Sequence, residues 1–122
     1  MTFKEYQEKS KETAIYLDRL KSKYPDLPKE IYKILSLSYL GNGLGEVGEI
    51  QGKIKKIIRD NGGSITKDMK KEISKECGDC LWYLSQLATE LELDLGEIAG
   101  QNLEKLNSRK QRNVLGGSGD NR

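Results

Sequence analysis

Two pairs of acidic residues with the same spacing are the part of this sequence best suited to chemistry. Glu46 and Glu49 lie three residues apart, as do Glu76 and Asp79. On a helix, residues three apart are neighbours on one face, so each pair presents two carboxylates together. Carboxylates gathered without partners resist ionisation together, and a divalent cation removes that conflict. Oxygen-only ligands favour Mg²⁺, with Mn²⁺ as a substitute, over Zn²⁺. The pattern therefore predicts metal-assisted hydrolysis of a phosphoryl group.

One such pair alone is a weak signal. Glu5 and Glu8 show the same spacing in a chain that contains 19 acidic residues. The competing interpretation is that Glu46 and Glu49 lie on a solvated helix face with Lys53. The repetition of the spacing in a second segment, and the glycine that each pair encloses, favour the metal site.

Composition limits the classes of function. A chain of 122 residues suits one domain, and 21 basic against 19 acidic side chains leave a net charge of +2. This balance gives little support to a nucleic-acid-binding protein, which needs a strongly basic face. The sequence has neither the run of about 20 apolar residues that spans a membrane nor an apolar signal core at its start. We expect a cytoplasmic protein without nucleic-acid or membrane partners. The absence of histidine excludes catalysis by His bases.

The two cysteines, Cys77 and Cys80, form a CxxC motif inside a helical pattern. A second cysteine pair, which a zinc site of this kind needs, is missing. We therefore expect both thiols to pack in the core, as free cysteines commonly do.

Apolar residues recur at intervals of three and four through most of the chain, which predicts an all-α fold. Pro25 and Pro28 mark one loop, and the segment 60–63 (Asp-Asn-Gly-Gly) marks another. Thr66, or Ser64, and Asp94 are expected to cap the helices that follow. The expected helical segments are 3–23, about 29–59, from 64 or 66 to about 90, and about 95–109.

A stripe of glycines, Gly41, Gly45, Gly48 and Gly52, follows the second segment at helical spacing. Each glycine in a helix interior costs about 1 kcal/mol relative to alanine, so the stripe needs a reason. Either another helix or a ligand approaches closely, or the helix breaks at residues 41–43. We favour a long helix that is kinked there. Because the apolar stripes are thin, further helical contacts between chains are expected.

The segments GLGEVGEIQGKIKK and KKEISKECGDCLWYL together resemble the MazG-like nucleoside triphosphate pyrophosphohydrolases, whose signature is ExxE followed by ExxD. The resemblance covers about residues 30–122, and the ending is similar to a subset found in phages and bacteria. It implies a four-helix bundle that assembles into a homo-oligomer, a dimer or a tetramer. It also implies Mg²⁺-dependent conversion of an NTP or dNTP to the monophosphate and pyrophosphate in a bacterial or phage-infected cytoplasm.

The resemblance also assigns roles to residues. Glu46, Glu49, Glu76 and Asp79 match the family's metal ligands, and one of them would orient or deprotonate the water that attacks the α-phosphate. The candidate substrate contacts are Lys53 and Lys56 for phosphates, Asn102, Lys105 and Arg109 for sugar or phosphates, and Tyr83 for the base or deoxyribose. For Tyr83, core packing is the alternative, and for the last-helix residues it is a solvated face.

Residues 1–112 are expected to form one MazG-like domain, and residues 113–122 a Gly-rich tail. The tail is either flexible or closes over the phosphates, with Arg122 or backbone N–H groups as donors.

Three alternative functions remain open at this point. The first is a non-enzymatic helical oligomerisation or interaction protein. The second is a hydrolase of the alarmone guanosine tetraphosphate. The third is a nucleic-acid-binding module that uses Lys53, Lys55, Lys56 and Arg59, against which the low net charge argues.

Overall fold

The chain folds into helices joined by short loops. A computed structural model describes residues 1–121, and no strand occurs in this part of the chain. Six α-helices and two 3₁₀ turns follow one another: α1 (Phe3–Ser10), η1 (Lys11–Thr13), α2 (Tyr16–Lys23), α3 (Lys29–Gly43), η2 (Leu44–Glu46), α4 (Val47–Asn61), α5 (Lys67–Glu90) and α6 (Leu95–Gln111). The predicted all-α fold is confirmed.

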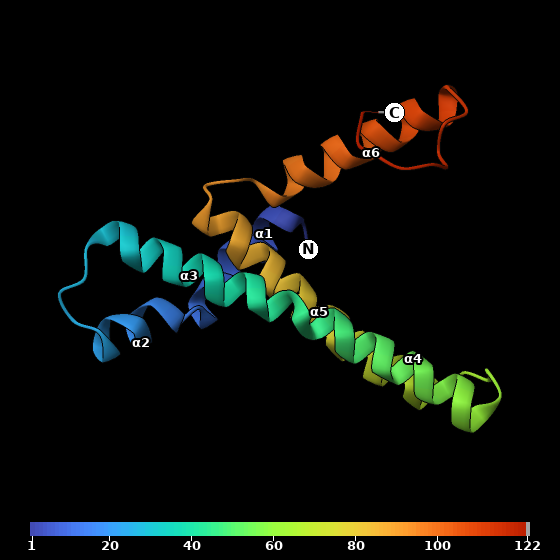
Figure 1. The fold of residues 1–122 in the computed structure, drawn as a ribbon, viewed down its shortest axis with the longest axis horizontal. Helices are drawn as coiled ribbons and strands as arrows, with labels where there is room; N and C mark the ends of the chain where they lie inside the picture. The colour runs from blue at the N-terminus through green and yellow to red at the C-terminus, as the bar shows by residue number, and fades with distance from the viewer. Residues whose placement is uncertain (122) are drawn as a thin grey trace.

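Helix α5 is the centre of the arrangement. It packs against α1, α3 and α4, whereas α6 packs mainly against α1. Figure 1 shows α4 and α5 running side by side as one arm, while α6 forms a second arm that points away from it. None of the helices in residues 1–121 is both long and apolar enough to cross a membrane. The most buried hydrophobic side chains are Tyr16, Tyr32, Leu40, Ile57, Ala88 and Leu95.

The first predicted segment, 3–23, is two helices rather than one. Ala14 has φ −85° and ψ 74°, which lies outside the helical region and separates η1 from α2. Thr13 Oγ1 donates to the carbonyl of Ser10 at 2.9 Å and accepts a hydrogen bond from Trp82 Nε1 at 2.8 Å. The break thus lies next to a contact with α5, which the periodicity of the segment does not reveal.

The second predicted segment is nearly continuous, as expected. Helix α3 passes through the 3₁₀ turn η2 into α4, and the backbone at Gly43, Leu44, Glu46 and Val47 stays right-handed helical. The turn lies directly after the Gly-Asn-Gly segment where the kink was predicted. Glu46 is the last residue of this turn and the N-cap of α4, so the local change in helix type occurs at an acidic residue of the first motif.

One glycine outside the predicted stripe has a clear packing role. A Cβ at Gly43 would overlap the ring of Tyr83 on α5, so glycine allows α3 and α5 to approach closely here. By contrast, a Cβ at any of the four stripe glycines meets nothing within 4 Å. Within the single chain, neither helix packing nor a protein group explains the stripe.

Caps define the remaining helices as the sequence indicates. Thr66 Oγ1 accepts from Met69 N at 3.2 Å at the start of α5, and Asp94 Oδ1 accepts from Glu97 N at 3.0 Å at the start of α6. Helix α4 ends at Gly62, whose φ of 57° is left-handed and favours glycine. This turn brings α5 back along α4.

The expected burial of both cysteines is wrong. Cys77 is exposed, and Cys80 is half-buried. Cys77 lies on a side of α5 that the neighbouring helices of the same chain leave uncovered. Its place in the apolar spacing of the helix therefore does not make it part of the core.

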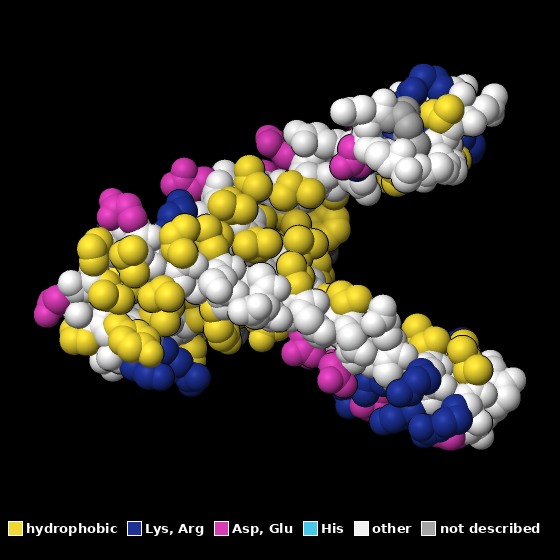
Figure 2. Space-filling model, viewed as in Figure 1, with side chains coloured by type: hydrophobic (Ala, Val, Ile, Leu, Met, Phe, Trp, Pro, Cys, Tyr) yellow, Lys and Arg dark blue, Asp and Glu magenta, His cyan; other side chains and the backbone are white. Residues whose placement is uncertain are grey.

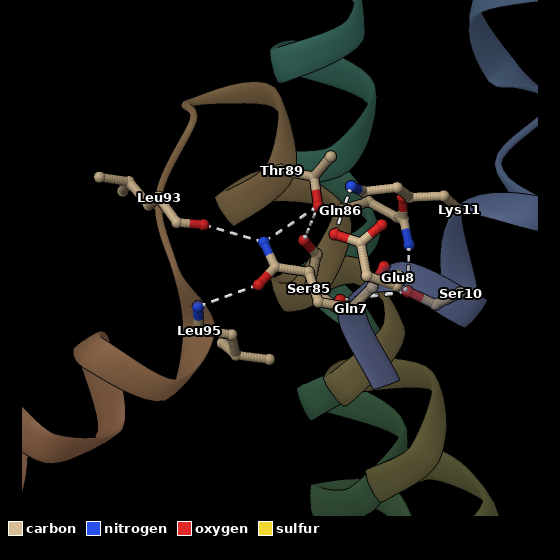
Figure 3. A network of polar contacts seen from close by, with 9 residues as sticks. All are labelled: Gln7, Glu8, Ser10, Lys11, Ser85, Gln86, Thr89, Leu93 and Leu95. Carbon is tan, nitrogen blue, oxygen red and sulfur yellow. Dashed lines mark hydrogen bonds and ion pairs between the residues drawn. The ribbon is translucent and has the colours of Figure 1, made fainter. Parts of the chain in front are cut away.

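A buried polar network fastens the connection between α5 and α6 to α1 (Figure 3). Gln7 Nε2 donates to Thr89 Oγ1 at 3.1 Å and to the carbonyl of Leu93 at 2.8 Å. Its Oε1 accepts from Leu95 N at 3.0 Å. Ser10 extends the network, because its hydroxyl accepts from Gln86 Nε2 at 2.8 Å. These contacts with α1 therefore determine the direction in which α6 extends from the end of α5.

The described part of the C-terminal tail turns back onto α6. Arg109 Nη2 donates to the carbonyl of Asp120 at 2.8 Å and to Asp120 Oδ1 at 3.3 Å. Arg109 is only 5% exposed as a result. The tail thus packs against its own helix, and Arg122, the predicted phosphate donor, lies outside the described residues.

Candidate functional site

Three of the four predicted carboxylates converge where α5 passes the start of α4. One carboxylate oxygen from each of Glu46, Glu76 and Asp79 lies within 4.8 Å of the others. Glu46 comes from η2, and the other two come from successive turns of α5. Glu46 and Glu76 are half-buried, whereas Asp79 is exposed. We refer to these three residues as the acidic cluster.

Glu49 is not part of the acidic cluster in this structure. It lies in the first turn of α4 and is exposed. Three residues turn an α-helix by about 300°, so Glu49 is rotated about 60° around the axis from Glu46. Its role as a metal ligand stays a prediction.

Lys53 pairs with the acidic cluster. Its Nζ lies 3.1 Å from Glu76 Oε1 and 4.0 Å from Glu72 Oε2, so the pair bridges α4 and α5. The sequence suggested Glu49, on the same helix, as the partner of Lys53, but the ion pairs of Lys53 join it to Glu72 and Glu76 on the facing helix. A cation is thus already held beside the carboxylates.

Lys56, the other predicted phosphate contact, lies further along the hairpin. It is exposed and, with Lys53, lines an open hollow of about 330 Å³ between α4 and α5. Asp60, Asp68 and Glu72 also line this hollow. Lys56 is therefore in the same groove as Lys53 but beside additional acidic groups.

Tyr83 lies at the edge of the acidic cluster and is packed rather than free. Burial raises the pKa of its hydroxyl, and the nearby Tyr39, Glu46 and Asp79 add to that rise. Its ring centroid lies 6.3 Å from that of Tyr39 and 5.1 Å from that of Trp82. Both earlier interpretations are thus compatible with its position, because it packs on α3 and borders the carboxylates.

The cluster has neighbours that the sequence analysis did not assign. Burial and the charge of Asp79 raise the pKa of Tyr6 from α1. Burial, Cys77 and the three carboxylates raise the pKa of the Cys80 thiol, which makes its thiolate less favoured. Tyr39 lies seven residues before Glu46, which is two helical turns, so this spacing was a usable signal. Tyr6 gave none, because its proximity depends on how α1 packs on α5.

The three candidates on α6 do not reach the acidic cluster within one chain. Asn102 and Lys105 are exposed on an arm that points away from the α4–α5 arm (Figure 1). Arg109 is buried by the tail, and Lys105 Nζ lies 3.8 Å from Asp120 Oδ1. The tail carboxylate thus sits between the two predicted phosphate-binding cations.

The donor set of the acidic cluster fits a hard divalent cation. Two oxygens bound to one Mg²⁺ lie at most about 4.2 Å apart, because each Mg–O distance is about 2.1 Å. The 4.8 Å separation approaches that limit, so small side-chain rotations bring the oxygens into range. The carboxylate oxygens and the absence of histidine suit Mg²⁺ or Mn²⁺ rather than zinc.

Known proteins that are similar in sequence establish the family of this chain. The model of the MazG nucleotide pyrophosphohydrolase domain matches residues 36–114, which include the whole acidic cluster. The chain therefore belongs to the MazG nucleotide pyrophosphohydrolase family. It is 50% identical over 90 residues to the Gene 37 protein of Mycobacterium phage L5, covering 73% of this chain and 79% of that protein. No solved structure matches the chain. The resemblance to MazG-like proteins is thereby confirmed.

Proposed function

We propose that this protein is a Mg²⁺-dependent pyrophosphohydrolase that converts a nucleoside triphosphate, preferably a dNTP, to the monophosphate and pyrophosphate. The observation that carries this proposal is the convergence of Glu46, Glu76 and Asp79 within 4.8 Å inside the segment that matches the family. Carboxylate oxygens from two separate segments, η2 and α5, are thereby available to one cation.

In this reaction, the oxygen of water bonds to the α-phosphorus. The bond between that phosphorus and the oxygen that bridges to the β-phosphate breaks, and pyrophosphate leaves with the electron pair. Glu46, Glu76 and Asp79 would hold Mg²⁺, which supplies Lewis-acid stabilisation of the phosphate charge when bound. One of the four motif carboxylates, including Glu49, accepts the proton from water.

Lys53 is placed to assist the departure of pyrophosphate. In the absence of substrate its ammonium group neutralises Glu76 at 3.1 Å. With a divalent cation held by the acidic cluster, the Lys53 ammonium group would be attracted to Glu76 less strongly. Lys53 can then turn toward the substrate phosphates, and its charge stabilises the leaving group.

We also propose that the active protein is a homo-oligomer. Ile54 and Ile58 on α4 are 45% and 65% exposed, and Leu103 on α6 is 62% exposed. Covering these side chains with a second copy removes apolar surface from water. It also offers α6 of one copy a route to the acidic cluster of the other, which Asn102 and Lys105 cannot reach in their own chain.

The first experiment is an assay of pyrophosphate and monophosphate release from each of the eight common NTPs and dNTPs with Mg²⁺. We expect equimolar products, faster turnover of at least one dNTP, and complete loss with EDTA. Turnover of guanosine tetraphosphate alone would replace the proposed substrate class with the alarmone. No turnover of any of these compounds by folded protein would contradict the proposed enzyme.

The same assay tests the residues. Glu49→Gln and Asp79→Asn should keep the fold and lose turnover, whereas Glu12→Gln in η1, an exposed site outside the motifs, should retain it. Near-normal turnover by either motif variant would contradict the four-carboxylate assignment.

A further inference from the structure

A second pocket lies at the end of the molecule opposite the α4–α5 hairpin. It has a volume of about 500 Å³ and lies between α2, the N-terminal part of α3 and the end of α5. We call it the α2–α3 pocket; its lining includes Lys21, Lys29, Tyr32, Lys33, Ser36 and Glu90. Pockets that bind small molecules typically measure about 300–1,000 Å³, so the size suits a ligand larger than a single ion.

The α2–α3 pocket is separate from the acidic cluster. Thirteen residues of nearly continuous helix separate Lys33 from Glu46, which corresponds to about 20 Å along the axis. The segment that matches the MazG family starts at residue 36. Lys21, Lys29, Tyr32 and Lys33 all precede it, so most of this wall belongs to the N-terminal part of the chain.

Three lysines give the pocket its anion-binding character. Lys29 and Lys33 lie one turn apart on α3, and Lys21 reaches in from α2, where its Nζ is 5.8 Å from the centroid of the Tyr32 ring. Among the described residues, none of these three ammonium groups has a carboxylate within ion-pair distance. Figure 2 shows a group of Lys and Arg side chains at the lower edge of this end of the molecule, with separate Asp and Glu side chains along its left and upper edges.

Ser36 supplies an independent indication of a ligand. The residue lines the pocket, is 1% exposed, and its Oγ has no hydrogen-bond partner among the described residues. Buried hydroxyl groups nearly always have a partner, so an unpaired one beside a cavity points to a bound group. It lies one turn beyond Lys33, on the same face of α3.

The opposite wall of the pocket offers acceptors. Glu90 Oε1 accepts from Tyr16 OH at 2.6 Å, which fixes the carboxylate at the end of α5. Glu92 follows it in the loop, and both line the pocket. A ligand that carries only negative charge would be repelled here, whereas hydroxyl or amino groups can donate to these carboxylates.

We propose that the α2–α3 pocket binds a small phosphate monoester that also carries hydroxyl or amino groups. The phosphate contacts Lys29 and Lys33, and a small rotation of Ser36, whose Oγ lies just beneath the pocket surface, lets this hydroxyl donate to the phosphate, while the organic part donates to Glu90. Nucleoside monophosphates and sugar phosphates share this chemistry. The inference does not depend on the activity proposed for the acidic cluster.

The test uses the full chain in EDTA, which keeps divalent cations from the acidic cluster. Binding of dAMP and of ribose 5-phosphate is followed by ¹H–¹⁵N NMR and calorimetry. We expect shifts for residues 21, 29–36 and 90–92, and the tighter of the two ligands identifies the source of the phosphate. No binding of either compound would overturn the proposal.

Variants locate the binding. Ser36→Ala removes a hydroxyl that has no hydrogen-bond partner among residues 1–121, so it should fold normally and bind about tenfold more weakly. Lys29→Gln with Lys33→Gln should abolish binding. Lys55→Gln with Lys110→Gln, an equal loss of charge at exposed sites elsewhere, should leave it unchanged.

Two results distinguish this proposal from its competitors. Binding that survives the Lys29/Lys33 change, or that falls equally with the control pair, would overturn it by indicating general attraction to a basic surface. Binding should persist in Glu46→Gln, because the acidic cluster is about 20 Å away. Loss in that folded variant would assign the ligand to the acidic cluster instead.

Discussion

At the scale of single residues, we expect the acidic cluster to lower the free energy of unfolding while it supports catalysis. Glu46→Gln removes one of three converging charges, each pair of which repels by up to about 1 kcal/mol in water-like surroundings. In EDTA we expect its free energy of unfolding to equal or exceed that of the wild type, while turnover with Mg²⁺ falls by about 100-fold or more. Urea unfolding and the pyrophosphate assay measure the two effects. A variant that loses stability in EDTA together with activity would indicate a structural role for Glu46.

A second residue-scale prediction concerns Tyr16. Burial, followed by the hydrogen bond and charge of Glu90, raises the pKa of its hydroxyl far above the ordinary value. The folded state therefore keeps this proton when the unfolded state begins to lose it near pH 10. The associated stability is fully present below pH 10 and falls above it, by up to about 1.4 kcal/mol per pH unit.

The measurement is thermal unfolding between pH 8 and pH 11. Tyr16→Phe removes the group that titrates, so its stability should decline less above pH 10 than that of the wild type. Tyr24→Phe, at a half-exposed site, is the control. Parallel declines in wild type and Tyr16→Phe would show that other groups govern the alkaline transition.

At the scale of secondary-structure elements, the connection between α5 and α6 depends on Gln7. Gln7→Ala leaves Leu95 N and the carbonyl of Leu93 without their partner, and unpaired buried groups cost about 1–3 kcal/mol each. We expect the free energy of unfolding to fall by about 3 kcal/mol and hydrogen exchange at residues 93–95 to become faster. Gln51→Ala on exposed α4 should stay within about 0.5 kcal/mol of wild type. Unchanged exchange at the connection would mean that α1 does not hold it.

The expected and the observed helices together show which features the sequence alone could predict. Apolar spacing and caps identified α3 to α6, because these are local patterns. The repeated acidic spacing predicted that four carboxylates meet, of which Glu46, Glu76 and Asp79 do and Glu49 does not. The division of segment 3–23 was missed, because Thr13 bonds to Trp82, which is 69 residues away in the chain. Burial of Gln7 and the position of Tyr6 beside Asp79 depend on the same packing of α1 on α5. Periodicity finds helices, but it does not say which of their faces meet.

At the scale of the whole molecule, the thin core predicts self-association. Ile58 is 65% exposed on the α4–α5 arm, and Leu103 is 62% exposed on the α6 arm. The stripe glycines, which lie on α3, η2 and α4, leave open space that a helix from another chain can approach. We expect a dimer or a tetramer in sedimentation at micromolar concentration, and a sedimenting monomer would contradict this.

Substitution at the exposed apolar sites connects assembly to activity. Ile58→Glu and Leu103→Glu place a charge where a partner would bury it, so each should dissociate the oligomer while leaving the helical content of the chain intact. Gln111→Glu, a charge change at a polar exposed site, should not. Because Asn102 and Lys105 cannot reach the acidic cluster of their own chain, the dissociated variants should also lose turnover. Full turnover by a stable monomer would mean that α6 takes no part in substrate binding and that the acidic cluster acts with groups of its own chain alone.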